Sequence, residues 1–184
     1  GSIGSELVRQ IASFAPSAMM LIDQAETPQH DMKLLMQNKF PSVACSVILA
    51  SIANEERMDK LFASFKPDYV FHAAAYKHVP MMEDNPSESI QNNIYGTKVV
   101  ADLSVKYGAK KFVMVSTDKA VNPTNVMGCS KRICEIYTQS LNAKLLHDYE
   151  KNGKKGDLPT QFVTTRFGNV LGSAGSVIPL FTRQ

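Results

Sequence analysis

Hydrophobic positions along the chain alternate between short continuous runs and longer stretches with helical spacing. Short apolar runs bounded by turn residues are typical of strands buried in a parallel sheet. We expect such strands at residues 18–23, 45–50, 69–75, 111–117 and 162–168. Between them apolar residues recur every three or four positions, which predicts helices at about 4–14, 29–38, 55–65, 86–107 and 125–151.

This regular alternation of strands and helices predicts an α/β fold built on a doubly wound, mostly parallel sheet. In sheets of this kind, ligands bind beyond the carboxyl ends of the strands. The polar residues at those ends are Asp23, His72, Ser116, Thr117, Asp118 and the segment 166–169. We therefore expect the functional site along this edge of the sheet.

Length, net charge and cysteine content limit the classes of protein to which the chain can belong. The 184 residues are enough for one core, so we expect a single domain over residues 1–184. The net charge of +3 is small and the basic residues are scattered, so nucleic acid is not an expected partner. Three cysteines without a C-x-x-C spacing indicate reduced thiols in a cytoplasmic domain, with neither a disulfide framework nor a metal site. No apolar run approaches the roughly 18 residues of a membrane-spanning helix.

The alternation of strands and helices is incomplete at both ends of the sequence. The chain begins with a helix that no strand precedes, and it stops in mid-pattern after residues 177–184. We therefore expect a fragment of a longer protein, truncated at both ends. An alternative origin for Gly1 and Ser2 is a cloning scar.

A glycine-rich turn opens the first predicted helix. Its residues are Gly1, Ser2, Ile3 and Gly4. Backbone N–H groups of such a turn can approach a phosphate, and a helix N-terminus favours the negative charge. Asp23 ends the next strand, where a carboxylate can accept hydrogen bonds from an adenosine ribose and repel a 2′-phosphate. Together they predict dinucleotide binding, with NAD favoured over NADP; the alternative for Asp23 is a cap on the following helix.

Two further segments carry candidate ligand contacts. At the end of the third strand, Ala73, Ala74 and Ala75 would let a flat ligand approach the backbone, and Lys77 would lie at its edge. The alternative is that small residues serve strand–helix packing, and we interpret His78 as a structural loop residue. In the helix at 86–107, Asn92 or Asn93 could bind an active-site group or water, and Asn92 is the candidate we assign to the cofactor.

The segment 115–131 carries the strongest chemistry. Thr117, Asp118 and Lys119 can all take part in proton transfer, and they follow a strand directly. Met127 and Lys131 are four residues apart at the start of a long helix, so they share a face. Taken alone, Lys131 has the alternative of facing water. A Ser/Thr, a Tyr and a Lys with this spacing form the hydride-transfer site of short-chain dehydrogenases, but Met127 stands where the Tyr would be and cannot exchange protons.

The chain resembles the extended short-chain dehydrogenase/reductase superfamily, and more closely the CapD-like nucleotide-sugar 4,6-dehydratases of capsule, polysaccharide and glycan biosynthesis. The residues that carry this resemblance are the segments 1–11, 21–26, 65–86, 92–97, 112–132 and 166–181. The blocks AAAYKHVP and STDKAVNPTNVMG are far more specific than the glycine turn. The resemblance implies a Rossmann-like NAD(P)-binding fold.

The resemblance also implies a reaction. The expected substrate is a UDP-N-acetylhexosamine, foremost UDP-GlcNAc. Bound NAD or NADP takes a hydride from C4, water leaves across C5 and C6, and the hydride returns to C6. The product is a 4-keto-6-deoxy sugar nucleotide.

Residue roles follow from the resemblance position by position. Gly1 and Gly4 match the later glycines of the pyrophosphate turn, and Asp23 matches the ribose position. Thr117 matches the residue that binds the C4 oxygen, and Asp118 with Lys119 matches the acid/base pair for the elimination. Their opposite charges stabilise each other's ionised form. Lys131 matches the cofactor-binding lysine, and the positions expected to bind the substrate are Lys77 and Asn169.

Three departures from the family pattern bear on these roles. Met127 in the tyrosine position leaves the C4 proton acceptor open between Lys131 acting through a water, Lys119 and Thr117. Ser51, followed by Ile52, stands where an acidic residue near adenine is usual, so cofactor affinity is expected to be lower. A first strand, a first glycine and most of the substrate-binding C-terminal part are expected to be missing.

The resemblance leaves alternative functions open. One is a nucleotide-sugar C4 epimerase on the same fold, which would not need the Asp118–Lys119 pair. Another is a non-catalytic domain that binds NAD or a UDP-sugar, which Met127 and Ser51 favour. Long helices such as those at 86–107 and 125–151 commonly pair between subunits in the superfamily that the chain resembles, so the resemblance implies a homo-oligomer. Any membrane anchor of the parent protein would lie outside these residues.

Overall fold

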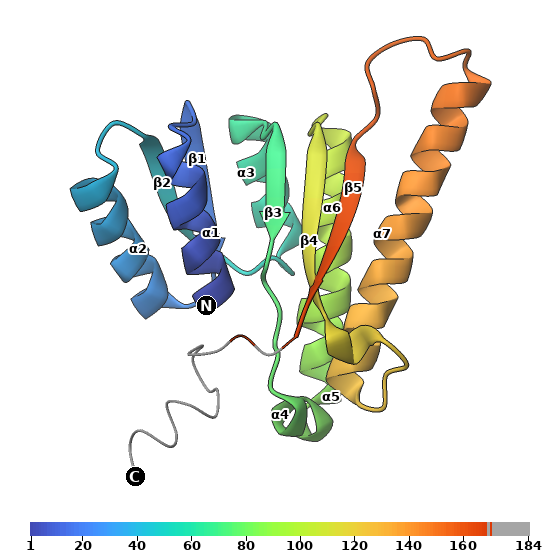
Figure 1. The fold of residues 1–184 in the computed structure, drawn as a ribbon, viewed down its shortest axis with the longest axis horizontal. Coiled ribbons are helices and arrows are strands. Elements are labelled where there is room, and N and C mark those ends of the chain that lie inside the picture. The colour runs from blue at the N-terminus through green and yellow to red at the C-terminus, as the bar shows by residue number, and fades with distance from the viewer. Residues whose placement is uncertain (169, 171–184) are drawn as a thin grey trace. The chain divides into compact units, whose positions relative to one another are not determined.

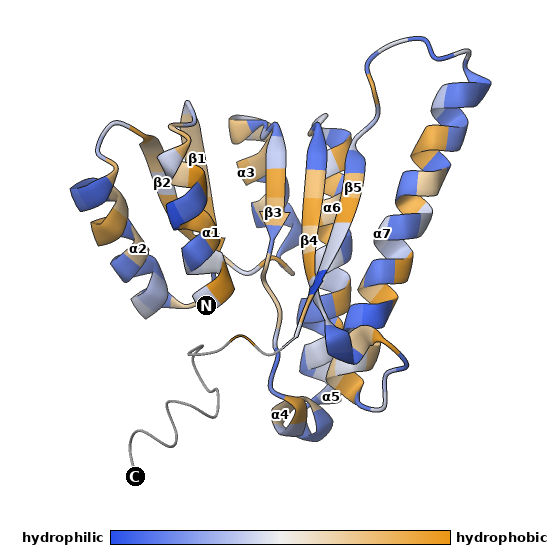
Figure 2. Ribbon diagram, in the orientation of Figure 1, coloured by the Kyte–Doolittle hydropathy of each residue, from blue (hydrophilic) through white to orange (hydrophobic). Residues whose placement is uncertain are grey.

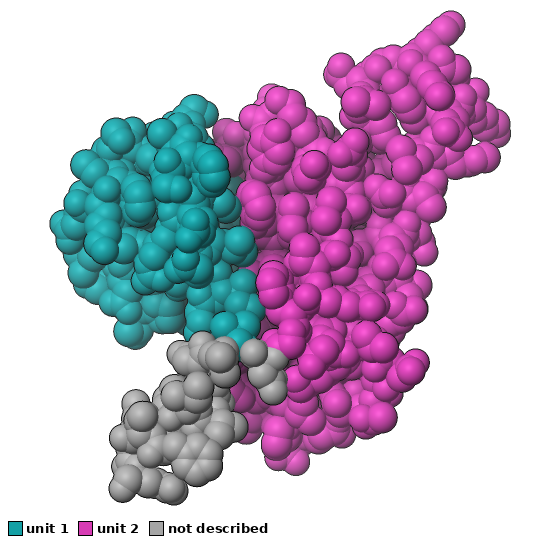
Figure 3. Space-filling model, in the orientation of Figure 1, with its two compact units in different colours: residues 1–51, 169–184 teal, residues 52–168 magenta. Residues whose placement is uncertain are grey.

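The computed structural model describes residues 1–168 and 170 (Figure 1). Its contacts group into two compact units, coloured separately in Figure 3. The described part of unit 1 is residues 1–51 and 170, and unit 2 is residues 52–168. All strand pairs are parallel, which confirms the predicted α/β class. The single domain expected from chain length stays a prediction.

The described part of unit 1 contains two strands and two helices. The elements are α1 (Ser2–Ser13), β1 (Ala18–Asp23), α2 (Glu26–Lys39) and β2 (Ala44–Leu49). Strands β1 and β2 pair from Ala18 opposite Ala44 to Asp23 opposite Leu49. Their core consists of Ala12, Met19, Met36 and Val43. The side chain of Gln29 on α2 donates to backbone carbonyls of both strands, at Leu21 (3.0 Å) and Ile48 (2.7 Å), so the helix is tied to the sheet.

Unit 2 holds a three-stranded sheet in the order β3–β4–β5. Its elements are α3 (Glu55–Phe65), β3 (Tyr69–His72), α4 (Val79–Asp84), α5 (Pro86–Glu88), the π-helix η1 (Ser89–Tyr95), α6 (Gly96–Lys106), β4 (Lys111–Thr117), the 3₁₀ turn η2 (Asp118–Ala120), α7 (Val126–Lys151) and β5 (Gln161–Phe167). Figure 1 shows α6 and α7 running along this sheet. Among the described residues, none of the helices is both long and apolar enough to span a membrane.

The core of unit 2 lies on one face of the central strand. Phe112, Met114 and Ser116 alternate along β4 as its buried positions, and the Phe112 ring packs against the rings of His72 and Phe162. Figure 2 shows hydrophobic residues filling the middle of β3 and β4. The alternation means that the opposite face of β4 is only half-buried, whereas a strand buried on both faces was expected.

Three other differences from the sequence analysis bear on the site. Strand β3 ends at His72, so residues 73–75 belong to a connecting segment and not to the strand. The helix predicted at 86–107 is present as a continuous helical segment up to Lys106, but its middle part, η1, is π-helical and lies between α5 and α6. The short helix α4, with Pro80 in its first turn, was not expected.

Candidate functional site

The carboxyl end of β4 turns directly into a hydrogen-bonded cluster of three side chains. The Thr117 hydroxyl donates to Asp118 Oδ1 at 2.9 Å, and Lys119 Nζ lies 3.2 Å from the same oxygen. The hydrogen bond from Thr117 and the contact with Lys119 lower the pKa of Asp118. Asp118 and Lys119 are also solvent-accessible, at 55% and 37% of their side-chain surface. The cluster is therefore an ionised, reachable acid/base pair beside a hydroxyl.

The first turn of α7 packs directly against this cluster. An ideal Cβ on Gly128 would lie 2.3 Å from the carbonyl oxygen of Lys119, so no larger residue fits without a backbone shift. The N-terminus of α7 is capped twice, since Asn125 Oδ1 accepts from Gly128 N (2.7 Å) and Glu83 Oε1 accepts from Val126 N (2.7 Å). The Lys119 turn and the start of the long helix α7 are therefore in direct contact.

Met127 and Lys131 are both buried on α7, at 3% and 5% exposure. The alternative in which Lys131 faces water is therefore wrong. Burial lowers the pKa of Lys131, and Glu135 one turn further along opposes that shift. Within the described residues its ammonium group makes no hydrogen bond or ion pair, which leaves a buried donor available to a ligand.

His72 was expected only as one of the polar residues at the strand ends, with no role of its own. Its imidazole is buried, with Nε2 2.8 Å from the Thr97 hydroxyl. Burial, reinforced by the charge of Lys131, lowers the pKa of His72 to about 3. The imidazole is therefore neutral at physiological pH and adds no charge beside Lys131.

A buried carboxylate ties the end of β5 to α7. Glu135 is fully buried, and Arg166 binds it through two bonds, Nε to Oε1 at 2.8 Å and Nη2 to Oε2 at 2.6 Å. Arg132 contributes a third bond at 3.0 Å. Burial alone would raise the pKa of Glu135, but the hydrogen bonds from the arginines outweigh it and the pKa falls to about 2. The pair brings Gly168 close to the cluster, because an ideal Cβ there would lie 3.9 Å from Asp118 Oδ2.

Unit 1 brings two of the predicted cofactor residues together. The Gly1 nitrogen lies 3.8 Å from Asp23 Oδ2, so the start of α1 and the end of β1 meet. Asp23 Oδ1 accepts a hydrogen bond from the backbone N–H of Ala25 (3.0 Å), the residue that precedes α2. Asp23 therefore also binds the start of the following helix, which is in part the alternative role predicted for it. The glycine positions are open, since nothing lies within 4 Å of an ideal Cβ on Gly1 or Gly4.

The remaining predicted residues divide between core and surface. Ile52 is buried, and an ideal Cβ on Gly96 would lie 2.6 Å from its Cδ1, so its side chain packs on α6. Asn92 is buried and donates to Asn93 Oδ1 at 3.1 Å. The half-buried residues are Ser51, Ala73, Ala74 and Ala75, and Lys77 is exposed. Asn169 lies outside the described residues.

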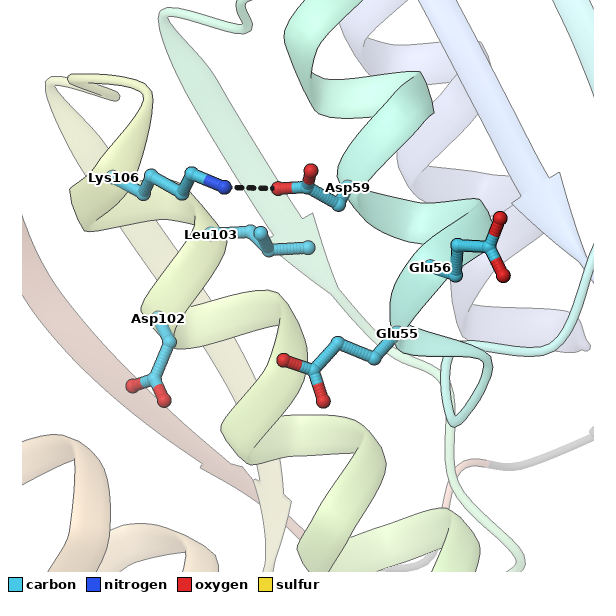
Figure 4. Close-up of a pocket in the computed structure, with 6 residues that line it drawn as sticks. All are labelled: Glu55, Glu56, Asp59, Asp102, Leu103 and Lys106. Carbon is cyan, nitrogen blue, oxygen red and sulfur yellow. Dashed lines mark hydrogen bonds and ion pairs between the residues drawn. The ribbon is translucent and has the colours of Figure 1, made fainter.

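A pocket between α3 and α6 is lined by six residues, Glu55, Glu56, Asp59, Asp102, Leu103 and Lys106 (Figure 4). None of them was predicted to belong to the site. Lys106 Nζ lies 2.6 Å from Asp59 Oδ1, and this ion pair joins the two helices across the pocket. We interpret this region as a polar contact surface between α3 and α6.

Comparison with known proteins shows the family to which the chain belongs. It matches the family model described as polysaccharide biosynthesis protein over residues 1–184. It is 47% identical to the capsular polysaccharide biosynthesis protein CapD of Staphylococcus aureus, over 100% of this chain and 29% of that protein. It is 34% identical to a UDP-N-acetylglucosamine 4,6-dehydratase (inverting) of Campylobacter jejuni (100% and 50%) and 38% identical to a UDP-glucose 4-epimerase of Rickettsia canadensis (89% and 43%). The chain thus spans half or less of the length of these relatives.

Solved structures agree on the fold. Pen from Bacillus thuringiensis superposes with a TM-score of 0.83 at 32% identity, over 100% of this chain and 52% of that one. The DesIV double mutant, a dTDP-glucose 4,6-dehydratase from Streptomyces venezuelae with NAD bound, gives a TM-score of 0.73 at 18% identity, over 100% and 58%. These neighbours confirm the predicted Rossmann-like fold. Matched from end to end by the family model and 47% identical to CapD, the chain belongs to the polysaccharide biosynthesis protein family.

Proposed function

We propose that this chain is the catalytic domain of a nucleotide-sugar 4,6-dehydratase that acts on UDP-GlcNAc and uses NAD. The observation that carries the proposal is the Thr117–Asp118–Lys119 cluster and its contact with the helix turn that holds Lys131. A dehydration needs a base and an acid close to one hydroxyl-binding group, and the cluster supplies all three. The 34% identity to a UDP-GlcNAc 4,6-dehydratase supports the same choice.

Taken separately, each unit presents residues that fit part of a nicotinamide dinucleotide. In unit 1, α1 begins at Gly1 without a side-chain cap and next to the Asp23 carboxylate, an arrangement suited to a pyrophosphate and a ribose. In unit 2, the buried Lys131 ammonium offers hydrogen bonds that a ribose hydroxyl would accept. The negative charge of Asp23 disfavours a 2′-phosphate, so we assign NAD in preference to NADP. When bound, a nicotinamide would supply hydride transfer, first from C4 of the sugar and later to C6, and a proton would return to C5 with the second transfer.

The chain's own groups handle the protons. The Thr117 hydroxyl, released from Asp118, would bind the C4 oxygen, and Lys131 would hold the ribose and stabilise negative charge nearby. The proton of the C4 hydroxyl would leave to one of three acceptors, Lys131 through a water, Lys119 or Thr117. Once C4 is a ketone, the C5 proton becomes acidic. Asp118 and Lys119 together then remove that proton and protonate the departing C6 hydroxyl as water. Before substrate arrives, the hydrogen bond from Thr117 and the contact with Lys119 lower the pKa of Asp118 and so favour its carboxylate form.

Two other functions have a specific observation behind them. The 38% identity to a UDP-glucose 4-epimerase favours an epimerase, although epimerisation has no use for the Asp118–Lys119 pair. Met127 is buried and has no proton to exchange, which favours a binding domain without catalysis.

Incubation of the full-length protein with UDP-GlcNAc, followed by mass spectrometry and NMR, separates the three functions. We expect a product that has lost the mass of one water and carries a C6 methyl group. An isomer of unchanged mass would indicate an epimerase, and recovery of the substrate with NAD still bound would indicate a binding domain.

A further inference from the structure

A buried carboxylate lies one helical turn from the buried lysine of α7. Glu135 and Lys131 are four residues apart on this helix and are 0% and 5% exposed. Side chains at this spacing are neighbours, with Cβ atoms about 5–6 Å apart, and a glutamate and a lysine so placed can form an ion pair. These two side chains do not pair, and within the described residues the Lys131 ammonium makes no hydrogen bond.

Two arginines bind the carboxylate instead. Arg166 on β5 donates from Nε to Oε1 of Glu135 at 2.8 Å and from Nη2 to Oε2 at 2.6 Å. Arg132 Nη1 donates to Oε2 at 3.0 Å. A guanidinium that binds both oxygens fixes the position and the plane of a carboxylate. Glu135 therefore cannot turn toward Lys131 without losing these bonds.

The other titratable groups that interact with the Lys131 charge, among the described residues, are His72 on β3 and Cys134 on α7. The pKa of His72 is about 3, so the imidazole is neutral at physiological pH. Burial raises the pKa of the Cys134 thiol, which is therefore uncharged as well. Glu135 is thus the anion that acts on Lys131 from its own helix, and its charge is shared with the two arginines.

We infer that Arg166 is a positioning residue, whose bond to Glu135 keeps this carboxylate from pairing with Lys131 and so leaves the buried ammonium to a ligand hydroxyl. The inference rests on the proposed function, since that function assigns the cofactor ribose to Lys131. In this role Arg166 acts through Glu135 and touches neither cofactor nor substrate. A lysine already paired with a carboxylate would have fewer donors to offer to the ligand.

The test measures the pKa of Lys131 by NMR in the cofactor-free full-length protein, labelled with ¹³C at the lysine Cε atoms. Lys131→Met identifies the signal. Arg166→Gln should raise this pKa, because Glu135 is then free to pair with the ammonium. Glu135→Gln should lower it, because the negative charge that favours the ammonium is gone while both arginines remain.

The opposite signs separate positioning from a merely structural role. Both substitutions break the same ion pair, so a loosened interior would admit water in both variants. Since burial is what lowers the pKa of Lys131, this pKa would then rise in both. A rise in Glu135→Gln would overturn the inference, and so would an unchanged value in Arg166→Gln. If one of the two variants does not fold by circular dichroism, the other decides by the same criterion.

Arg132→Gln is the matched control. Arg132 and Arg166 both bind Glu135 and their side chains are equally exposed, at 41%, but Arg132 contributes only one bond and lies on the same helix as Glu135. We expect Arg132→Gln to change the pKa of Lys131 less than Arg166→Gln does. Equal effects would show that Arg166 does not hold the carboxylate in the way inferred.

Calorimetric titration of the full-length protein with NAD tests the consequence for the ligand. Arg166→Gln should raise the Kd for NAD about tenfold, the expected loss for one hydrogen bond from a charged group, and Arg132→Gln should raise it less. Opposite pKa shifts with an unchanged Kd would overturn the claim that the ammonium is kept for this ligand. If the wild type does not bind NAD, the proposed function fails, and the pKa values of Lys131 still decide the role of Arg166.

Discussion

Gly128 lies so close to the carbonyl oxygen of Lys119 that an ideal Cβ would be 2.3 Å away. This contact joins the acid/base cluster to the helix that carries Met127 and Lys131. Backbone-to-backbone approach of this kind tolerates no side chain, because neither partner can rotate out of the way. The glycine after Met127 is therefore as necessary to the geometry as the polar residues around it.

Gly128→Ala should displace the Lys119 turn from the start of α7. We expect the free energy of unfolding to fall by about 1–3 kcal/mol, the usual cost of overpacking, and kcat to fall about 100-fold. Urea denaturation and steady-state kinetics measure the two effects. Cys129→Ala is the matched control, because Cys129 is the next residue and is exposed, so its change should stay within about 0.5 kcal/mol. Equal effects of the two substitutions would show that the close contact is unimportant.

Lys131→Met should separate stability from function. A buried ammonium without a protein partner destabilises the cofactor-free fold, so its replacement by an apolar side chain of similar length is expected to raise the free energy of unfolding by about 1 kcal/mol. Turnover should be lost at the same time. The control is Lys144→Met, at an exposed position further along α7, which should change neither. A marked loss of stability in cofactor-free Lys131→Met would contradict this interpretation.

His72 should make the protein sensitive to mild acid. Its pKa falls from 6.5 to about 3 on folding, so between these values the unfolded chain binds a proton that the folded chain does not. Stability therefore decreases as the pH drops below about 6.5, by up to about 1.4 kcal/mol per pH unit from this group. His72→Gln keeps a hydrogen-bonding group for Thr97 but removes the titration.

Urea denaturation between pH 7 and pH 5 measures this effect in both proteins. The variant should be the less stable of the two at pH 7, and the difference should shrink as the pH falls. A difference that stays constant over that range would rule out His72 as the source.

Glu135→Gln should weaken the attachment of β5 to α7. The substitution keeps the shape of the side chain but leaves Arg166 and Arg132 without a buried counter-charge. Loss of one partner of a fully buried ion pair costs about 3–5 kcal/mol. Because both arginine side chains are 41% exposed and can turn to water, we expect a smaller loss here, although a larger one than for a surface pair. Because the pKa of Glu135 falls from 4.5 to about 2, the contribution is present above about pH 4.5 and is lost as the pH falls through about 2.

Thermal or urea unfolding at pH 7 checks the Glu135 prediction. Glu56→Gln is the control, since Glu56 pairs with Lys60 on the surface of α3 and such pairs contribute about 0–1 kcal/mol. A loss no larger than that of the control would mean that the arginines find other partners.

The sequence predicted the elements well where local pattern decides them. All five strands were found because each is a continuous apolar run, and α7 was placed within one residue of its start because Asn125 is a typical cap. The helix predicted at 86–107 contains a π-turn that was not expected. The apolar spacing of the segment is that of one α-helix, and no local sequence signal marks the π-turn at Asn93. Helix α4 was missed because six residues are too few to show a period.

The site was predictable only where its residues are neighbours in sequence. Thr117, Asp118 and Lys119 are consecutive, and their contact follows from that. The roles of His72 and Glu135 depend on partners that lie 25 and 31 residues away, at Thr97 and Arg166. Such pairs arise from the packing of α6, α7 and β5, which a single sequence does not encode in any local pattern.

We propose that a nicotinamide held in this site would accept the hydride from C4 and give it back at C6, while the Asp118–Lys119 pair removes water between the two transfers. The most direct measurement is an NMR analysis of the product formed by the full-length protein from UDP-GlcNAc that carries deuterium at C4. We expect a 4-keto product in which the deuterium has moved to the C6 methyl group. Deuterium that returns to C4, or a sugar that keeps its C6 hydroxyl, would contradict it.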